Sequence, residues 1–419
     1  MRSTSTSLLA GFVASAAAAG ALNVTACGGK KADSHGATHA AAGAGGKRAS
    51  APLVPPPPAP RPVASLENLA LSSPTDPRVS EGARAYARYC ALCHGNDAKG
   101  YAADHAPSLV SPTFLASASD DFLVRSIRGG RPGTAMAGYG RDRGGPLSDT
   151  EMAALIAFIR AQGPAYVEPL APAAGGNAAQ GQVTYDATCK RCHGTPEFRG
   201  DVIHLGNPAF LSSATDGFLR HAIREGRPGT PMLPFGGTFD EAQISDLVAL
   251  IRSWGPALPP AAVSVVAPPL PPPDLGPVVI NPQGGQPAFT LRENRFLPID
   301  LVKKALDAKK KLVIIDARAT SDWLVMRIPG SVSIPYYELK NLSAVPNDGT
   351  WVLAYCACPH HASGVVIDEL RKLGYKNTAI LDEGILEWDK RKYPIARQAP
   401  PARSGGAAAR HPSEAPHPH

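Results

Sequence analysis

Sulfur-containing and aromatic residues are scarce in this chain. Its 419 residues include seven Cys, five Met and four Trp, and aromatic residues make up 6%. Neither charge sign dominates, because 42 Lys and Arg face 35 Asp and Glu. A nucleic-acid groove needs clustered basic residues with aromatic partners, and the nearest basic cluster, Lys303–Lys311, lies on a predicted surface helix. The composition therefore predicts no nucleic-acid partner.

Long apolar runs are also missing after the first residues of the chain. Leu8–Leu22, preceded by Arg2, has the length of a signal-peptide apolar region and is short for a membrane span. It ends in the string V-T-A-C, which resembles the lipobox of bacterial lipoproteins and implies lipidation of Cys27. An ordinary signal peptide cleaved after Ala26 is the alternative. We expect a lipid anchor on the periplasmic side of a bacterial membrane, either inner or outer.

Pro and Gly, by contrast, are abundant, with 43 and 41 residues, and much of the length is expected to be linker. We predict a signal peptide over 1–26, a disordered tether over 27–75, a Pro-rich linker over 257–288 and a disordered tail over 398–419. The predicted folded domains span 76–165, 177–256 and 289–397.

Four of the seven Cys lie in two C-x-x-C-H strings, Cys90–His94 and Cys189–His193. Random placement would give about 0.003 such matches. Two thiols at this spacing form thioethers with one haem, and the adjacent His binds its iron. A zinc site made from the four thiols is an alternative, but it leaves both His residues and the repetition unexplained. The strings predict two covalent c-type haems, held by Cys90, Cys93, Cys189 and Cys192, with His94 and His193 as iron ligands.

The region around these strings is repeated. Gly82 and Tyr86 recur as Gly181 and Tyr185, each 99 positions later, together with both motifs. A second string, Arg128–Met136, matches Arg224–Met232 at an offset of 96. Each unit is predicted to close with a helix, which in the first follows a capping box at Ser148–Glu151 and in the second contains Leu247–Ile251.

The second axial ligand is predicted to be Met136 for the first iron and Met232 for the second, because these two residues occupy the same place in both units. A thioether opposite imidazole raises the haem potential and suits an electron carrier. The polar, turn-rich surroundings disfavour the alternative of a buried core Met. His105 and His204, each 11 residues after a proximal His, leave bis-His ligation as a further alternative.

Both units resemble class I c-type cytochrome domains, which are all-α. That resemblance covers 76–165 and 177–256. It implies six-coordinate iron and hence electron transfer rather than substrate chemistry at the metal. It also implies that the carbonyls of Pro107 and Pro208 accept hydrogen bonds from the proximal imidazoles.

The C-terminal part shows a different pattern, with strands and helices alternating. Strands are predicted at Leu312–Ile315, Trp351–Tyr355 and Thr378–Leu381. A helix with an apolar stripe of Leu301, Val302, Ala305 and Leu306 precedes them, and another is expected near 363–373. This alternation predicts an α/β fold with a parallel sheet covered by helices on both faces.

The strings Ile315–Arg318, Ile328–Pro335 and Leu381–Gly384 resemble those of a rhodanese-like domain across about 289–397. The resemblance implies that Cys356, at the end of a central strand, carries a persulfide. Loop N–H groups and a helix N-terminus would favour the anionic sulfur there.

The loop after Cys356 departs from the rhodanese pattern. Cys358, Pro359, His360 and His361 stand where the family usually offers Gly and often Arg. Cys358 could attack a persulfide on Cys356, form a disulfide with it, or bind copper together with the two His. Three interpretations remain open: a sulfur-handling site, a copper or disulfide sensor, and a non-catalytic binding domain.

The sequence as a whole predicts a membrane-anchored dihaem electron carrier outside the cytoplasm. Its expected partners are exported redox proteins or a membrane electron-transport complex. The alternative is an enzyme, a sulfurtransferase or sulfur oxidiser acting on a small sulfur compound at Cys356 and passing electrons to the haems.

Overall fold

A computed structural model describes residues 76–101, 103–255, 276–357 and 360–397. The predicted signal peptide, Cys27, the tether, the tail, Cys358 and most of the Pro-rich linker lie outside these residues. Every described residue belongs to Pro52–His419, one of the two units into which contacts divide the chain. None of the helices among the described residues is long and apolar enough to cross a membrane.

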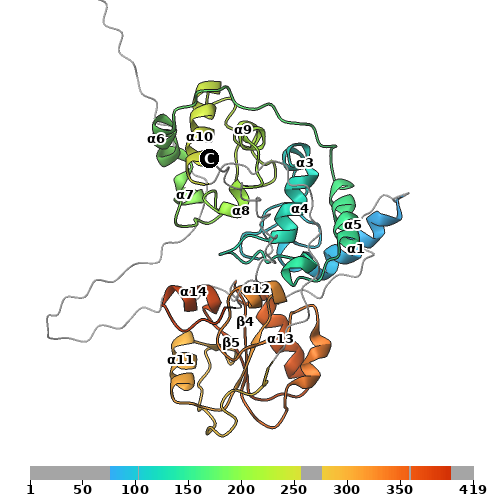
Figure 1. The fold of residues 1–419 in the computed structure, drawn as a ribbon, viewed down its shortest axis with the longest axis vertical. Helices are drawn as coiled ribbons and strands as arrows, with labels where there is room; N and C mark the ends of the chain where they lie inside the picture. The colour runs from blue at the N-terminus through green and yellow to red at the C-terminus, as the bar shows by residue number, and fades with distance from the viewer. Residues whose placement is uncertain (1–75, 102, 256–275, 358–359, 398–419) are drawn as a thin grey trace, which may run out of the picture. The chain divides into compact units, whose positions relative to one another are not determined.

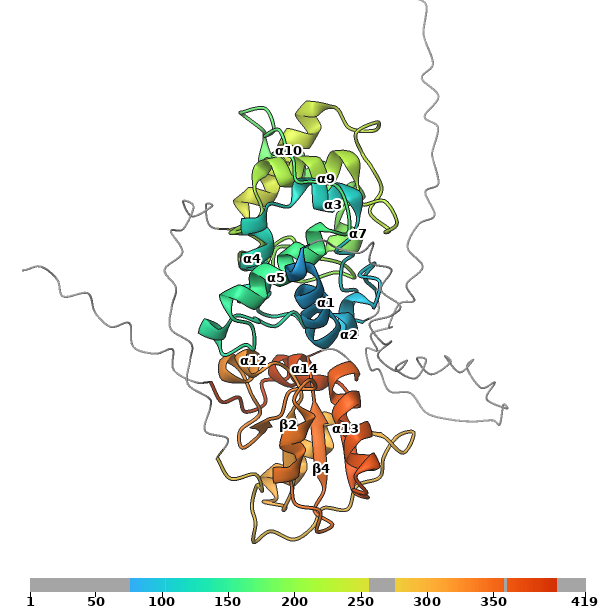
Figure 2. The ribbon, with the colours of Figure 1, turned by 90° about the vertical axis from the view of Figure 1, so that its right-hand side faces the viewer.

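The first helical unit is built on a crossing of its first and last long helices (Figures 1 and 2). Its helices are α1 (Pro77–Tyr89), α2 (Ala91–His94), α3 (Pro112–Ser117), α4 (Asp120–Gly129), the 3-10 helix η2 (Arg141–Arg143) and α5 (Asp149–Arg160). The predicted capping box is confirmed, because Ser148 and Glu151 exchange both bonds at the start of α5. Gly82 allows the close crossing, since a Cβ there would lie 2.0 Å from the carbonyl oxygen of Ala154 on α5.

The second helical unit repeats this arrangement. Its helices are α6 (Ala178–Thr188), α7 (Lys190–His193), α8 (Pro208–Leu211), α9 (Asp216–Glu225) and α10 (Glu241–Ser253). A Cβ on Gly181 would lie 2.2 Å from the carbonyl oxygen of Asp246, so this glycine again permits α6 to meet α10. Here Asp240 and Gln243 form a capping box that the sequence analysis missed. Buried side chains of both units form one continuous apolar core.

The C-terminal domain is a parallel sheet, as predicted, and its five strands have the order β1-β5-β4-β2-β3. Figure 1 shows β4 and β5 among the helices of this domain. Its strands are β1 (Phe296–Leu297), β2 (Val313–Asp316), β3 (Val332–Ser333), β4 (Val352–Tyr355) and β5 (Thr378–Leu381). Its helices are α11 (Ile299–Asp307), α12 (Thr320–Val325), η3 (Leu339–Ala344), α13 (His361–Lys372) and α14 (Gly384–Lys390). All three predicted strands and both predicted helices are present.

Alternate residues of the central strands enter two different cores. Val313 and Ile315 of β2 join one core with Ile367 of α13, whereas Ile314 joins the other with Val302 of α11. This is the pattern of a sheet buried on both faces. The predicted stripe on α11 was wrong in one residue, because Leu301 is 40% exposed and faces solvent.

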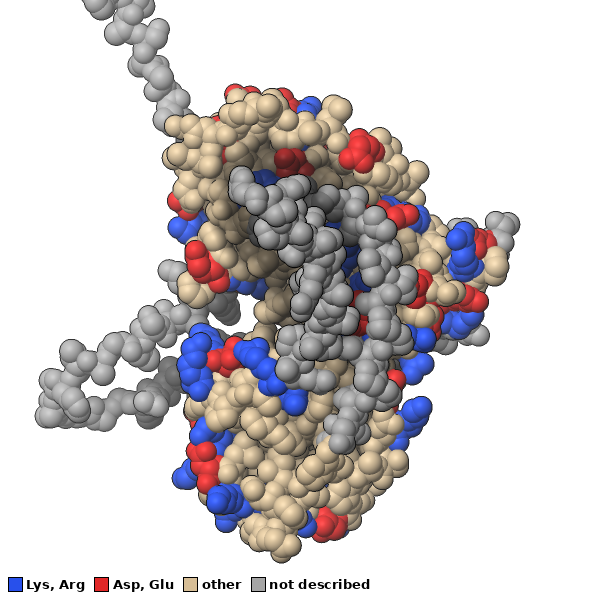
Figure 3. Space-filling model, in the orientation of Figure 1, with Lys and Arg blue, Asp and Glu red and all other residues tan. Residues whose placement is uncertain are grey.

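Charged side chains of both signs are interspersed on the face shown in Figure 3. Many pair with neighbours, as Arg391 does with Asp300 and Glu387. Such pairs at the surface contribute little to stability.

Candidate functional site

The first C-x-x-C-H string forms a short turn directly after α1. The N–H of Cys90 donates to the carbonyl of Tyr86, and α2 carries the rest of the string to His94. Gly95 then reverses the chain with φ +80°, a conformation that favours glycine. The buried Tyr86 hydroxyl donates to the Gly95 carbonyl at 2.6 Å and fixes this turn from below.

The second string has the same construction. Cys189 donates its N–H to the carbonyl of Tyr185, and the Tyr185 hydroxyl donates to the carbonyl of Gly194 at 3.1 Å. The repeated Tyr that the sequence showed is therefore a support for each C-x-x-C-H turn.

Each motif imidazole is oriented by a backbone carbonyl. His94 Nδ1 lies 2.9 Å from the oxygen of Pro107, and His193 Nδ1 lies 3.0 Å from that of Ile203. A His that donates through Nδ1 presents Nε2 as its ligand atom. The expectation for Pro107 is confirmed, but that for Pro208 was wrong. Pro208 instead begins α8. The loop after His193 is shorter, so that the carbonyl that meets the imidazole belongs to Ile203, only ten residues after the His.

Burial shifts the pKa values of the groups in both motifs. Desolvation lowers the pKa of His94 and of His193, which favours the neutral imidazole that binds metal. Burial also raises the pKa of the Cys90 thiol to about 12. Cys90, Cys93, Cys189 and Cys192 form no disulfide.

The loops that carry Met136 and Met232, residues 130–136 and 226–232, are called the Met loops here and have matching backbone geometry. In the first, the N–H of Arg131 donates to the carbonyl of Met136 at 2.7 Å, and Thr134 accepts from the Met136 N–H at 3.1 Å. In the second, Arg227 donates to Met232 at 2.9 Å and Thr230 accepts from Met232 at 3.2 Å. Both Met residues are partly buried. The loop places an aliphatic thioether at the same point of each unit.

The two His residues considered as alternative ligands lie in unlike settings. His204 directs Nε2 to the carbonyl of Thr195 at 3.0 Å. His105 has a left-handed backbone conformation with φ +51°. The two units thus match at Met136 and Met232 and differ at these His.

The residues of both units fit a haem. Each unit brings the two cysteine thiols of its motif, an oriented imidazole and a Met loop. Arg131 and Arg227 add partly buried positive charge. Among the described residues, no acidic side chain forms an ion pair with either one. Haem carries two carboxylates, which such charge can balance.

Cys356 directly follows β4 and is 2% exposed. Its sulfur lies 3.3 Å from the hydroxyl of Ser363 on α13, and its carbonyl accepts from the N–H of Ile385 at 3.0 Å. Gly384 has φ +69°, and a Cβ there would lie 2.6 Å from the Cys356 carbonyl oxygen. Ser363 is a polar contact of the candidate nucleophile that the sequence analysis did not single out.

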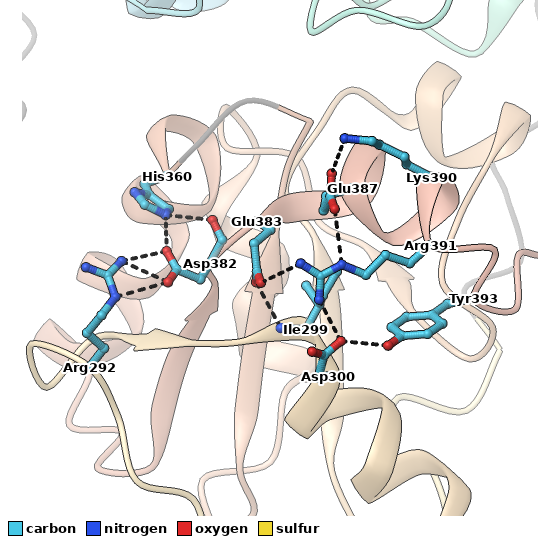
Figure 4. A network of polar contacts seen from close by, with 10 residues as sticks. All are labelled: Arg292, Ile299, Asp300, His360, Asp382, Glu383, Glu387, Lys390, Arg391 and Tyr393. Carbon is cyan, nitrogen blue, oxygen red and sulfur yellow. Dashed lines mark hydrogen bonds and ion pairs between the residues drawn. The ribbon is translucent and has the colours of Figure 1, made fainter. Parts of the chain in front are cut away.

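His360 points toward an acidic side chain at the end of β5 (Figure 4). Its Nε2 lies 2.8 Å from the carbonyl and 2.9 Å from the carboxylate of Asp382, so this nitrogen carries the proton. Arg292 binds the same carboxylate at 2.7 Å. His360 therefore has only Nδ1 left as a ligand atom, a constraint on the copper interpretation that the sequence could not reveal.

The C-terminal domain contacts the first helical unit next to its C-x-x-C-H turn. The Tyr336 hydroxyl donates to the carbonyl of Tyr89 at 2.6 Å, and Ser321 donates to that of Gly138 at 2.5 Å. The pKa of the Cys93 thiol is raised to about 12, first by burial and then by the charge of Cys356. Leu92, which lies between the two cysteines of the first motif, packs against the apolar core that contains Cys356.

Family models match both parts of the chain. The model described as cytochrome c oxidase, cbb3-type, subunit III matches residues 77–159 and again 176–251, and the rhodanese-like domain model matches 299–391. The chain carries a cytochrome c region and a rhodanese-like domain. The cytochrome c region implies haem c and electron transfer.

Two curated relatives match part of the chain. One is the cbb3-type cytochrome c oxidase subunit FixPc of Rhizobium leguminosarum bv. viciae, 33% identical over 22% of this chain and 31% of its own length. The other is the subunit FixP of Bradyrhizobium sp. (strain ORS 278), 31% identical over 20% of this chain and 28% of its own length. The chain thus spans less than a third of either relative.

Solved structures resemble the rhodanese-like domain. A rhodanese-like domain from Anabaena is 18% identical, covering 30% of this chain and 97% of that chain, with a TM-score of 0.24. A thiosulfate sulfurtransferase from Pseudomonas aeruginosa is 28% identical, covering 26% of this chain and 21% of that chain, also with a TM-score of 0.24.

Proposed function

We propose that the chain is an exported electron carrier with two covalently attached c-type haems, one in each helical unit. The observation that carries this proposal is the shared geometry of the two units. In each, a Tyr hydroxyl supports the C-x-x-C-H turn, a carbonyl orients the imidazole, and a Met loop has the same hydrogen bonds.

The proposed roles follow from this geometry. Cys90, Cys93, Cys189 and Cys192 would form thioethers, His94 and His193 would be proximal ligands, and Met136 and Met232 would be distal ligands. Haem iron supplies a one-electron redox couple when it is bound. The protein holds its ligands on short, hydrogen-bonded turns, so that they move little between the two oxidation states.

Intact mass and a spectroelectrochemical titration test the proposal. We expect a mass increase of two haems and two one-electron steps. Replacing both Cys90 and Cys93 by Ala should remove one haem and one step, and the Cys189→Ala and Cys192→Ala pair should remove the other. A single haem, or one retained after both cysteines of its motif are lost, would contradict the assignment.

We propose further that the chain is anchored by lipid at Cys27 on the periplasmic side of a bacterial membrane. The V-T-A-C string supports the anchor, and the likeness to cbb3-type oxidase subunits supports a partner in a membrane electron-transport complex. Cys27→Ser should release the protein from membranes of the producing cell. Retention of that variant in the membrane fraction would exclude a lipid anchor at this residue.

A second candidate function is sulfur chemistry at Cys356, favoured by the position of its thiol directly after β4, 3.3 Å from the Ser363 hydroxyl, and by the packing of Leu92 against the core that contains it. The Cys356 thiolate would attack the outer sulfur of thiosulfate, the S–S bond would break, and sulfite would leave with the electron pair. The persulfide would then join a second thiosulfate through a new S–S bond, and the two electrons released would be accepted by two ferric haems, one each. Thiosulfate added to the oxidised protein should reduce the haems, and Cys356→Ser should stop this. Equal reduction rates in both proteins would leave the rhodanese-like domain a binding or sensing role.

A further inference from the structure

The two helical units meet at a seam formed by four phenylalanines. Phe122 and Phe218 stack with centroids 4.7 Å apart, and Phe114 and Phe210 pack against them edge-on. Two of these rings come from each unit, so neither unit could bury its pair alone. The seam is therefore part of the apolar core that the two helical units share.

An arginine from each Met loop lies on these rings. Arg131 of the first unit stacks on Phe210 of the second, with its guanidinium carbon 5.8 Å from the centroid, and Arg227 of the second stacks on Phe114 of the first at the same distance. Burial lowers the pKa of both guanidinium groups to about 10, which still leaves them charged at neutral pH. Charge on the aromatic faces adds to the attraction between the units.

Direct hydrogen bonds cross the seam at the same two loops. Asn207, at the start of α8, donates through Nδ2 to the carbonyl of Pro132 at 2.9 Å. Thr113, in the first turn of α3, donates through its hydroxyl to the carbonyl of Gly226 at 2.7 Å. Each donor lies at the start of a short helix whose first residue is a Pro, and each acceptor belongs to the Met loop of the other unit.

These acceptors are adjacent to the bonds that hold the Met residues. Pro132 follows Arg131, whose N–H donates to the carbonyl of Met136. Gly226 precedes Arg227, whose N–H donates to the carbonyl of Met232. We propose that Asn207 positions Met136 and that Thr113 positions Met232, so that each unit holds the distal ligand loop of the other. The proposal rests on the Met ligation proposed above.

Two conservative variants test whether the hydrogen bonds across the seam position the Met residues, or whether the donor residues only stabilise their own helices. Thr113→Val keeps the shape and removes the hydroxyl donor. Asn207→Ser keeps an oxygen that can cap α8, where Asn207 now accepts from Ala209 and Phe210, and is too short to reach Pro132. Ser117→Ala and Ser212→Ala are the matched controls, because these hydroxyls bond only within their own helical segments.

The readouts are the two reduction potentials and the charge-transfer band that ferric haem shows when Met is bound. Met136→Ala should remove the contribution of the first unit to the band and shift the potential of that unit, and Met232→Ala should do so for the second. These two variants therefore assign each potential and each part of the band to one unit. We expect Asn207→Ser to weaken the band and lower the potential of the first unit, where Met136 lies. Thr113→Val should do the same in the second unit. The control variants should shift neither signal.

Changes confined to the unit that carries the substitution, or no change at all, would overturn the cross-seam role. If the unsubstituted protein shows two haems but no Met band, the ligation itself is wrong and this inference falls with it. A Met band that is present and insensitive to both variants would leave the electron-carrier proposal intact and remove only the positioning role. Because both variants can be measured singly in the full chain, no truncated unit has to fold alone.

Discussion

His193 Nδ1 lies 3.0 Å from the carbonyl oxygen of Ile203. The corresponding contact of His94 is with Pro107, three residues further from its motif, at 2.9 Å. The hydrogen bond that orients the imidazole is thus preserved while the residue that supplies it changes. A backbone carbonyl can be supplied by any residue type, so the loop is free to shorten as long as its path returns to the ring.

The first prediction concerns the distal ligands. Replacing Met136 or Met232 by Ala should lower one of the two potentials by on the order of 100 mV, since axial ligands set haem potentials over a range of ~0.8 V. Loss of the thioether removes the ligand that favours ferrous iron. Spectroelectrochemistry would measure both potentials in each variant. Unchanged potentials in either variant would contradict Met ligation in that unit.

The second prediction concerns the tyrosines beneath the two motif turns. Tyr86→Phe removes a buried hydroxyl that donates to Gly95 at 2.6 Å, and Tyr185→Phe removes the matching bond of 3.1 Å to Gly194. Each loss should lower the free energy of unfolding by about 1 kcal/mol. The shorter bond should make Tyr86→Phe the more costly of the two. Denaturant titration would measure both, and a stability equal to that of the unsubstituted protein would show that the hydroxyls are dispensable.

The third prediction concerns the crossing of α1 and α5. Gly82→Ala places a methyl group against the Ala154 backbone and should destabilise the protein by about 1–3 kcal/mol through overpacking. Gly129→Ala is the matched control on α4, because a Cβ there meets nothing within 4 Å. That control should be neutral or stabilising by up to about 1 kcal/mol, from the helix propensity of Ala. The melting temperature should therefore fall for Gly82→Ala and stay unchanged or rise for Gly129→Ala.

Local features were predictable from the sequence, and long-range contacts were not. The run Thr378–Leu381 became β5 with the predicted bounds, since a short apolar run between turns has few other structures. The capping box at Ser148 depends on residues three apart and was equally visible. The acceptor for His193 depends on the path of a loop, and the Asn207–Pro132 bond joins residues 75 positions apart. Asp382 binds His360 from the end of another strand, a relation that spacing alone does not reveal.

The last prediction is a pH dependence in the rhodanese-like domain. Burial raises the pKa of Asp322 to about 6, although Arg318 lies 3.6 Å away. An unfolded Asp titrates near 3.9, so the folded state holds the proton more tightly. The stabilisation this provides is fully present below about pH 4 and is lost as the pH rises through about 6. Because the side chain is one-fifth exposed, we expect a loss of up to about 2 kcal/mol. Asp322→Asn cannot titrate, so its free energy of unfolding relative to the unsubstituted protein should rise between about pH 4 and pH 7. Parallel stability curves for the two proteins would show that Asp322 has an ordinary pKa in the folded state.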